Sequence, residues 1–218
     1  MKIFSSLEEI SNIEPTVVAL GNFDGIHRGH QQIINRCIKE AEAAGLKNGV
    51  FTFANHTSNV IKGIKPVKNI LYTEEKIRLL EEMGVDYLFN IPFTTEILQM
   101  SPVEFIDKIL VGKFNIREAY CGFNYRFGYK AEGTPEVLMH EGIDRGFGIH
   151  VQEPFEIDGV LVSSTYIRGL IEEGRMEETT KFMGRRYTIS GEVVEGNKNG
   201  RKFGFPTCNT LIDDTMVT

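Results

Sequence analysis

The chain has 218 residues, 41% of them hydrophobic and 25% charged, which is enough to bury a full core in one large domain with a small addition. Its net charge of −6 argues against broad binding to nucleic acid, and no apolar run approaches the ~20 residues that a membrane-spanning helix needs. Glu8 and Glu9 come too early for a secretory signal peptide, and three widely spaced cysteines fit reduced thiols in a cytoplasm rather than a zinc site.

Strand and helix patterns alternate over the first 180 residues. Apolar runs predict strands at 16–21, 48–53, 86–91, 117–121 and 149–152. Helical patterns between them predict helices at 29–44, 73–83, 102–111, 134–145 and 164–173. This alternation is typical of an α/β fold with a doubly wound parallel sheet, in which ligands bind at the carboxyl ends of the strands.

The pattern and the charge both change near Gly184. Residues 1–180 contain 18 Lys and Arg against 26 Asp and Glu, whereas residues 181–218 contain six against four. The strand-like stretch YTISGEVVEG and a turn rich in Gly, Lys and Asn follow the change. We therefore predict one domain over residues 1–184 and a separate segment over residues 185–218.

The ten residues GNFDGIHRGH, 21–30, join the first predicted strand to the first predicted helix. A helix N-terminus attracts anions, and Gly25 and Gly29 remove side chains where a ligand would approach the backbone. His27 and His30 add donors that can be cationic near neutral pH. These features together predict a phosphate site. The glycine spacing fits neither a dinucleotide dehydrogenase nor a P-loop enzyme.

The same turn allows plainer interpretations. A single histidine is more often structural than catalytic, and Asp24 could simply cap the following turn. Two histidines could also bind a metal ion, although zinc needs a further ligand and the sequence has no cysteine or histidine cluster to supply it.

A second stretch, VSSTYIRGL at 162–170, strengthens the phosphate interpretation. Ser163, Ser164 and Thr165 precede a helical pattern, where Ser and Thr are ordinary N-caps. Arg168 in the first turn would oppose the helix dipole unless an anion binds there. Hydroxyl groups and a guanidinium at a helix start predict a second phosphate clamp.

The two motifs together resemble the nucleotidyltransferase superfamily with an H-x-G-H motif. More closely, essentially the whole chain is similar to the bifunctional bacterial riboflavin kinase/FMN adenylyltransferases, or prokaryotic FAD synthetases. The resemblance also rests on GFNYRFGYKAEGT (122–134), LYTEEKIRLLEEMGVDYLFNIPF (71–93), MSPVEFIDKIL (100–110) and GEVVEGNKNGRKFGFPTCNT (191–210). It implies a Rossmann-like doubly wound sheet of the nucleotidyltransferase type, followed by the first strands of an incomplete β-barrel.

The resemblance implies that the FMN phosphate attacks the α-phosphate of ATP, giving FAD and pyrophosphate. His27, His30 and Arg168 would be catalytic, and Asn124 and His56 would bind the flavin. The implied ATP-binding residues are Gly21, Asn22, Phe23, Asp24, Gly29, Ser163, Ser164 and Thr165. Mg²⁺ would bind the phosphates, with no direct protein ligands in the first domain.

The last segment would be the start of a riboflavin kinase module, in which Thr207 and Asn209 bind Mg²⁺–ATP. The glutamate that activates riboflavin would lie beyond Thr218. We therefore expect FAD synthesis from FMN without riboflavin kinase activity, and a cut near Gly184 should leave that synthesis nearly intact. Thr57 stands where the family often has proline, and Cys208 where it usually has alanine.

Two other functions remain open on the residues alone. One is a nucleotidyltransferase with another phosphorylated acceptor, such as a phosphopantetheine or nicotinamide mononucleotide. The other is a non-catalytic protein that binds nucleotide and flavin. In each case we expect a cytoplasmic protein with small-molecule ligands, which for the enzyme are ATP, FMN and riboflavin. We expect neither nucleic-acid nor membrane partners, and the oligomeric state stays open.

Overall fold

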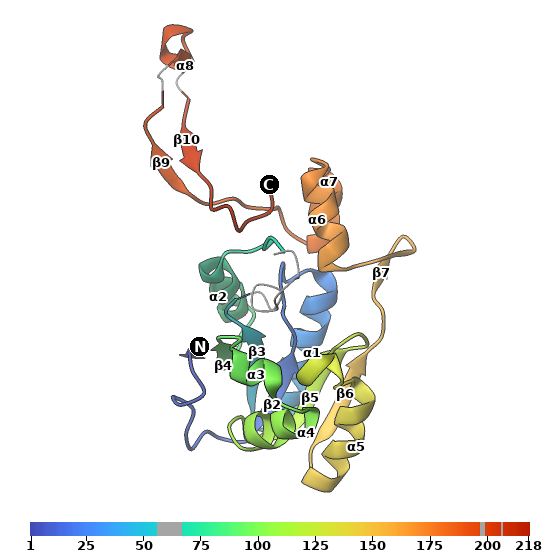
Figure 1. Cartoon of the computed structure of the whole chain (residues 1–218). Helices are drawn as coiled ribbons and strands as arrows, with labels where there is room; N and C mark the ends of the chain where they lie inside the picture. Colours follow the sequence, from blue (N-terminus) through green and yellow to red (C-terminus); the bar gives the residue numbers. More distant parts are fainter. Residues whose placement is uncertain (56–66, 197–198, 206) are drawn as a thin grey trace.

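A parallel sheet forms the centre of the computed structural model, which describes residues 1–55, 67–196, 199–205 and 207–218 (Figure 1). Within these residues the sheet has six strands in the order β1-β4-β3-β2-β5-β6, and every neighbouring pair is parallel. The strands are β1 (Lys2–Phe4), β2 (Thr16–Leu20), β3 (Lys47–Phe53), β4 (Tyr87–Ile91), β5 (Ile116–Gly122) and β6 (Gly148–Gln152).

Helices follow most of these strands along the chain. They are α1 (Arg28–Ala44), α2 (Thr73–Glu82), α3 (Thr95–Gln99), α4 (Pro102–Phe105), a π-helical segment (Ile106–Val111), α5 (Pro135–Arg145), α6 (Ser164–Glu172), α7 (Met176–Met183) and α8 (Asn199–Lys202). A 3-10 turn (Tyr129–Ala131) precedes α5. Two hairpins complete the described fold, β7 (Glu156–Ile157) with β8 (Val160–Leu161), and β9 (Glu192–Val194) with β10 (Asn209–Leu211).

The doubly wound α/β fold predicted from the sequence is confirmed. The five predicted strands are β2 to β6, and four predicted helices are α1, α2, α5 and α6, all with ends within one residue of the prediction. The predicted helix 102–111 is α4 continued by the π-helical segment, which lets the N–H of Gly112 donate to the carbonyl of Asp107 at 2.9 Å. Strand β1, helices α3 and α7 and the hairpin β7–β8 were not predicted, because each is too short to show a clear period.

Two hydrophobic clusters cover the two faces of the sheet. Val17 and Ala19 of β2 belong to the cluster that includes residues of α1 and α2, whereas Val18 and Leu20 belong to the cluster beneath α4, the π-helical segment and α5. Successive side chains of a strand point to opposite faces, so both faces of β2 are buried. This explains why β2 reads as an unbroken apolar run in the sequence.

The connections change direction at β2. After β2 the chain passes through α1 to β3 on one side, whereas β5 lies against the other side of β2. A crevice opens at the carboxyl ends of the strands where the strand order reverses in this way. The loops that follow β2 and β5 therefore flank the expected ligand site.

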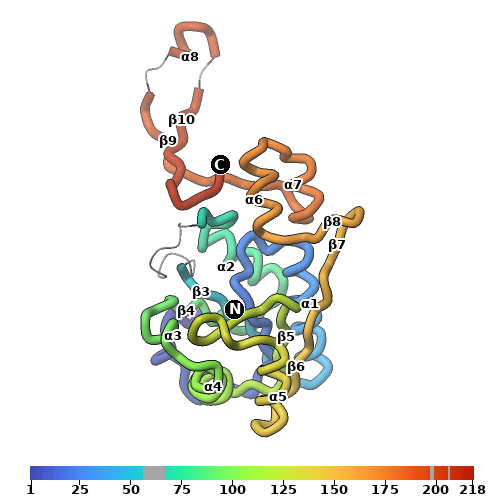
Figure 2. The backbone as a smooth tube through the Cα atoms, turned by 45° about the vertical axis from the view of Figure 1, so that its right-hand side comes forward, coloured from blue at the N-terminus to red at the C-terminus, as the bar shows by residue number. Residues whose placement is uncertain are grey.

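The C-terminal segment leaves the body of the molecule and then returns to it (Figures 1 and 2). The hairpin of β9 and β10 extends away, with Val193 and Leu211 exposed. Residues 215–217 come back against Asn69, and Met216 and Val217 are buried there. The strand-like stretch YTISGEVVEG contains β9, whose residues are exposed and pair with β10.

No helix in the described part of the chain combines the length and the apolar character that crossing a membrane requires.

Candidate active site

The two histidines of the H-x-G-H motif lie at the start of α1, as the sequence predicts. His27 is the N-cap residue, and its Nδ1 accepts a hydrogen bond from the backbone N–H of His30 at 3.2 Å. The two imidazole rings stack with their centroids 3.5 Å apart. The first N–H groups of the helix have no partner within the helix and add a partial positive charge beside these rings.

In the free site, burial disfavours the cationic form that the sequence allows for these histidines. Burial lowers the pKa of His27 to about 4, and the charges of Arg185 and Arg168 lower it further. Burial also lowers the pKa of His30 well below its ordinary value, with contributions from His27 and Lys76. Both rings are therefore neutral at pH 7 until an anion enters, because a nearby negative charge raises a histidine pKa.

The turn between β2 and α1 holds a strained backbone. Phe23, Gly25 and Ile26 have φ values of 47°, 86° and 35°, a region that β-branched residues such as Ile26 rarely enter. Such conformations cost ~1–3 kcal/mol each, cluster at functional sites and persist where the surroundings fix them.

Hydrogen bonds to the backbone carbonyls fix this turn. Every carbonyl from residue 22 to residue 26 accepts a hydrogen bond. The donors are Thr52 and Lys76 for residue 22, the Ile26 N–H for residue 23 and Ser164 for residue 24. Arg185 donates to the carbonyl of residue 25, and both Gln31 and Arg185 donate to that of residue 26. Since each carbonyl is bound to a donor from the chain, the strained turn is held from several sides.

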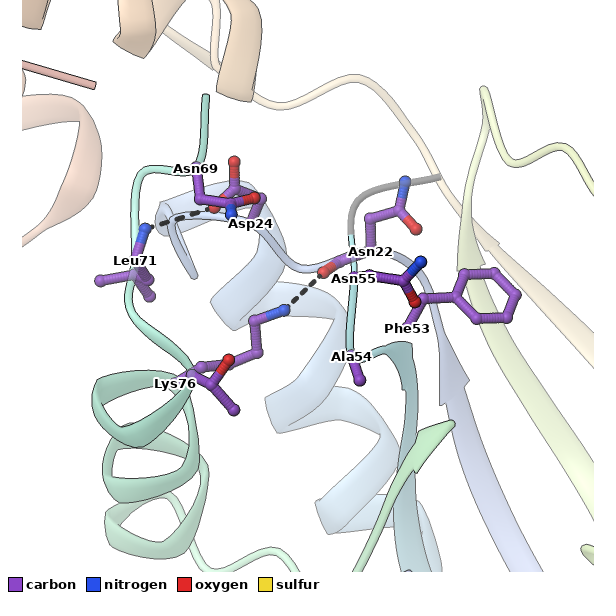
Figure 3. Close-up of a pocket in the computed structure, with 9 residues that line it drawn as sticks. Asn22, Asp24, Phe53, Ala54, Asn55, Asn69, Leu71 and Lys76 are labelled. Atoms are coloured by element: carbon purple, nitrogen blue, oxygen red, sulfur yellow. Dashed lines mark hydrogen bonds between the residues drawn. The ribbon is translucent and has the colours of Figure 1, made fainter. Parts of the chain in front are cut away.

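Asp24 connects this turn to the loop that precedes α2. Its Oδ1 accepts hydrogen bonds from the backbone N–H groups of Ile70 at 2.9 Å and Leu71 at 3.3 Å. Figure 3 shows the contact with Leu71. Its Oδ2 accepts a charged hydrogen bond from Arg168 Nη2 at 2.6 Å. The carboxylate is buried and anchors the neighbouring loop rather than capping its own turn.

The second motif reaches the site through Asp24. Ser163 is the N-cap of α6, and Ser164 Oγ donates to the Asp24 carbonyl at 2.8 Å, whereas Thr165 is exposed. Arg168 is the fifth residue of α6, past the first turn, and its Nε also donates to the carbonyl of Lys68. The anion that sequence reasoning required beside this cation is thus present within the chain, as Asp24.

We expect Arg168→Ala to lower the free energy of unfolding by about 2 kcal/mol, because it leaves the buried Asp24 carboxylate without its cation. Chemical denaturation at pH 7 measures the change. In an Asp24→Asn background the same substitution should cost much less. Equal costs in both backgrounds would show that the two side chains do not depend on each other.

A small pocket opens beside Asp24 (Figure 3), lined by Asn22, Asp24, Phe53, Ala54, Asn55, Asn69, Leu71, Thr73 and Lys76. Lys76 Nζ donates to the carbonyl of Asn22 at 3.3 Å, and burial lowers the lysine pKa. Sequence reasoning missed Lys76. The available signal was its place four residues before the buried Leu80, which puts both side chains on the same face of α2.

A cavity of about 890 Å³ lies at the carboxyl ends of β2 and β5. Its aromatic lining consists of Phe23, Phe51, Phe53, Phe93, Phe105, Tyr125, Phe127 and Tyr129. Gly21, Asn22, His30, Asn124 and Ser164 also line it. Asn22 and Phe53 line both pockets, so the apolar cavity and the polar pocket are neighbours.

The remaining predicted site residues are more scattered. Gly29 is buried, and a methyl group added there would lie 3.4 Å from the His27 ring, an ordinary contact, so packing within the chain does not require glycine. Thr207 and Asn209 are exposed in the distal segment and line neither pocket. His56 lies outside the described residues. No group of three or more His, Cys, Asp or Glu side chains in the described ranges is arranged to hold a metal ion.

Comparison with protein families gives two adjacent matches. The family described as FAD synthetase matches residues 9–166, and the family described as riboflavin kinase matches residues 183–218.

Curated relatives named bifunctional riboflavin kinase/FMN adenylyltransferase match nearly the whole chain. The Listeria monocytogenes protein is 37% identical over 92% of this chain, the Bacillus subtilis protein 34% over 93%, and the Escherichia coli K12 protein 31% over 96%. The chain spans 64% of the length of the first two and 67% of the third.

A solved structure from Streptococcus pneumoniae, described as a macrolide-efflux protein, is 29% identical and superposes with a TM-score of 0.88, covering 99% of this chain and 70% of that one. The fold, the family match over most of the chain and the named relatives agree: this chain belongs to the FAD synthetase family.

Proposed function

We propose that this chain transfers the adenylyl group of ATP to FMN, giving FAD and pyrophosphate. One observation carries the proposal: an aromatic cavity large enough for a flavin adjoins a helix N-terminus with two stacked histidines, and His30 belongs to both. The family to which the chain belongs supports the same reaction.

The cavity suits the flavin. Its volume of about 890 Å³ lies in the range of small-molecule sites, and flat aromatic side chains favour stacking with a planar ring system. In this proposal the flavin ring occupies the aromatic part, Asn124 bonds to its polar edge, and the FMN phosphate points toward His30.

The polar side suits the triphosphate. The N-terminus of α1, the two histidines and Lys76 surround the approach with positive or donor groups. Ser163, Ser164 and Thr165 start a second helix beside them, and Arg168 balances the charge of Asp24, so that this carboxylate does not repel the phosphates. We assign the glycine at position 29 to contact with a phosphate, since the chain leaves room for a side chain there.

The chemistry needs positioning and charge neutralisation rather than a covalent enzyme intermediate. A phosphate oxygen of FMN forms a bond to the α-phosphorus as the bond from that phosphorus to the β-phosphate oxygen breaks. Negative charge from the phosphates raises the pKa values of His27 and His30, which then donate to the crowded α-phosphate and the departing pyrophosphate. Mg²⁺, bound to the phosphates of ATP, would neutralise further charge, and we assign it no protein ligand.

The proposal divides the chain at Gly184. Residues 1–184 would be the adenylyltransferase domain and residues 185–218 the first part of a riboflavin kinase module, with Thr207 and Asn209 directed to its Mg²⁺–ATP. A single hairpin is marginal in water, so we assign no kinase activity to β9 and β10 alone. Three free cysteines fit the proposed cytoplasmic location.

The test is incubation of the 218-residue chain with ATP, Mg²⁺ and one acceptor at a time, with products separated by chromatography. We expect FAD from FMN, and no product from riboflavin, phosphopantetheine or nicotinamide mononucleotide. Binding of ATP and FMN without release of pyrophosphate would identify a sensor instead. Transfer to one of the other acceptors would replace FMN.

A further inference from the structure

Arg185 contacts the strained turn from outside the domain assigned to adenylyl transfer. Its Nη2 donates to the carbonyl of Gly25 at 2.6 Å, and its Nη1 donates to the carbonyl of Ile26 at 3.0 Å. These are two of the positive-φ residues of the turn. One planar guanidinium thus bridges two successive carbonyls immediately before the His27 cap.

The environment of Arg185 is unusual for a structural arginine. It is half-buried, and burial lowers its pKa, an effect that the charge of Glu75 opposes from beyond salt-bridge distance. A partly buried cation is costly to desolvate, and the only hydrogen bonds of its guanidinium among the described residues are the two to the carbonyls of the turn. Its charge also contributes to keeping His27 and His30 neutral.

The chain around Arg185 is fixed on both sides. Gln31 Nε2 donates to the carbonyls of Ile26 and Met183 at 2.8 and 2.9 Å, which joins the turn to the end of α7. Two residues after Arg185, the Tyr187 hydroxyl donates to the carbonyl of Val217 at 2.6 Å. The outgoing chain at 185–187 and the returning chain at 215–217 are therefore bound to each other.

The returning chain holds the opposite wall. The N–H of Asn69 donates to the carbonyl of Thr215 at 2.7 Å, and the N–H of Val217 donates to the carbonyl of Asn69 at 3.0 Å. Asn69 lines the small pocket, and the next two residues donate to Asp24. Residues of the C-terminal segment thus contact both the turn and the loop facing it.

We propose that Arg185 is a positioning residue of the adenylyltransferase site, acting through the carbonyls of Gly25 and Ile26 to hold the turn that presents His27 and the N-terminus of α1 to the nucleotide. This inference rests on the proposed function. It also changes one expectation from the sequence: a cut near Gly184 removes Arg185, so it should impair FAD synthesis rather than leave it nearly intact.

The test compares Arg185→Ala with the control variant Arg186→Ala. Arg186 is the next residue along the chain, is exposed, and makes no hydrogen bond with the turn among the described residues. For Arg185→Ala we expect kcat for FAD formation to fall at least about tenfold, since small misplacements of reacting groups cost up to ~10²-fold. The KM for FMN should stay unchanged, because the aromatic cavity does not include this residue. Arg186→Ala should match the wild type.

Chemical rescue separates positioning from a general loss of structure. Millimolar methylguanidinium should restore at least part of the kcat of Arg185→Ala and should leave Arg186→Ala unchanged. Two results would overturn the inference and leave the proposed function standing. One is a wild-type kcat in Arg185→Ala. The other is a reduced kcat that methylguanidinium does not restore, in a variant that melts at the wild-type temperature. If Arg185→Ala melts lower, Arg185→Lys must retain more activity than Arg185→Ala at a temperature where both are folded. A wild-type chain that makes no FAD overturns the proposed function itself.

Discussion

Replacing His30 by alanine is expected to reduce the rate of FAD formation by ~10²-fold or more, because one preorganised donor to developing charge is worth roughly 3–4 kcal/mol in the transition state. His30 lines the aromatic cavity and stacks on His27 at the start of α1, so it stands between the two proposed substrates. Steady-state rates with FMN, ATP and Mg²⁺ measure the effect.

The fold should survive this substitution. His30 Nδ1 is buried and has no hydrogen-bond partner among the described residues, so removing the ring breaks no side-chain hydrogen bond of the free protein. The backbone N–H of residue 30 would still donate to His27 Nδ1. An unpaired buried polar atom usually costs stability, which supports a role that becomes satisfied only when the substrate binds.

His140 offers a matched control. It lies on α5 with a largely exposed side chain and lines neither pocket, so His140→Ala should leave the rate unchanged. A folded His30→Ala protein with wild-type turnover would rule out the proposed role of the H-x-G-H motif. A rate that falls equally in both variants would point to a general effect of losing a histidine.

The fold was predictable because the sheet is buried on both faces. Strands such as β2 appear as continuous apolar runs, and the helices between them show a clear helical period. The elements that escaped prediction have two to eight residues, and the π-helical segment depends on backbone hydrogen bonding that side-chain spacing does not reveal. Length and burial thus decided which elements the sequence disclosed.

The site was predictable only in part. Its glycines, histidines and hydroxyl groups follow strands or start helices, where local sequence is informative. The pairing of Asp24 with Arg168 joins residues 144 positions apart, and the contacts of Arg185 with the turn span about 160. No local pattern encodes such contacts, so the sequence suggested phosphate as the anion for Arg168 where the chain supplies a carboxylate.

The burial of His27 should make the protein less stable as the pH falls from 6.5 toward 4. The unfolded ring titrates near 6.5 and the folded ring near 4, so between these values the unfolded chain binds a proton that the folded chain does not. Stability therefore rises with pH across this window. The full difference corresponds to about 3 kcal/mol for this one ring. His30 has a lowered pKa too and adds to the same slope.

The substitution His27→Asn isolates this contribution. The asparagine Oδ1 takes nearly the place of Nδ1 and can accept the hydrogen bond from the His30 N–H, so the helix keeps its cap while the titrating ring is gone. Denaturant unfolding of both proteins at pH 6.5, 5.5 and 4.5 should show a steeper loss in the wild type, while groups common to both cancel in the difference. Parallel losses would mean that His27 binds its proton equally well in the folded and unfolded chain. In that case burial does not exclude the proton, and the site would not depend on the phosphates to make protonation of His27 possible.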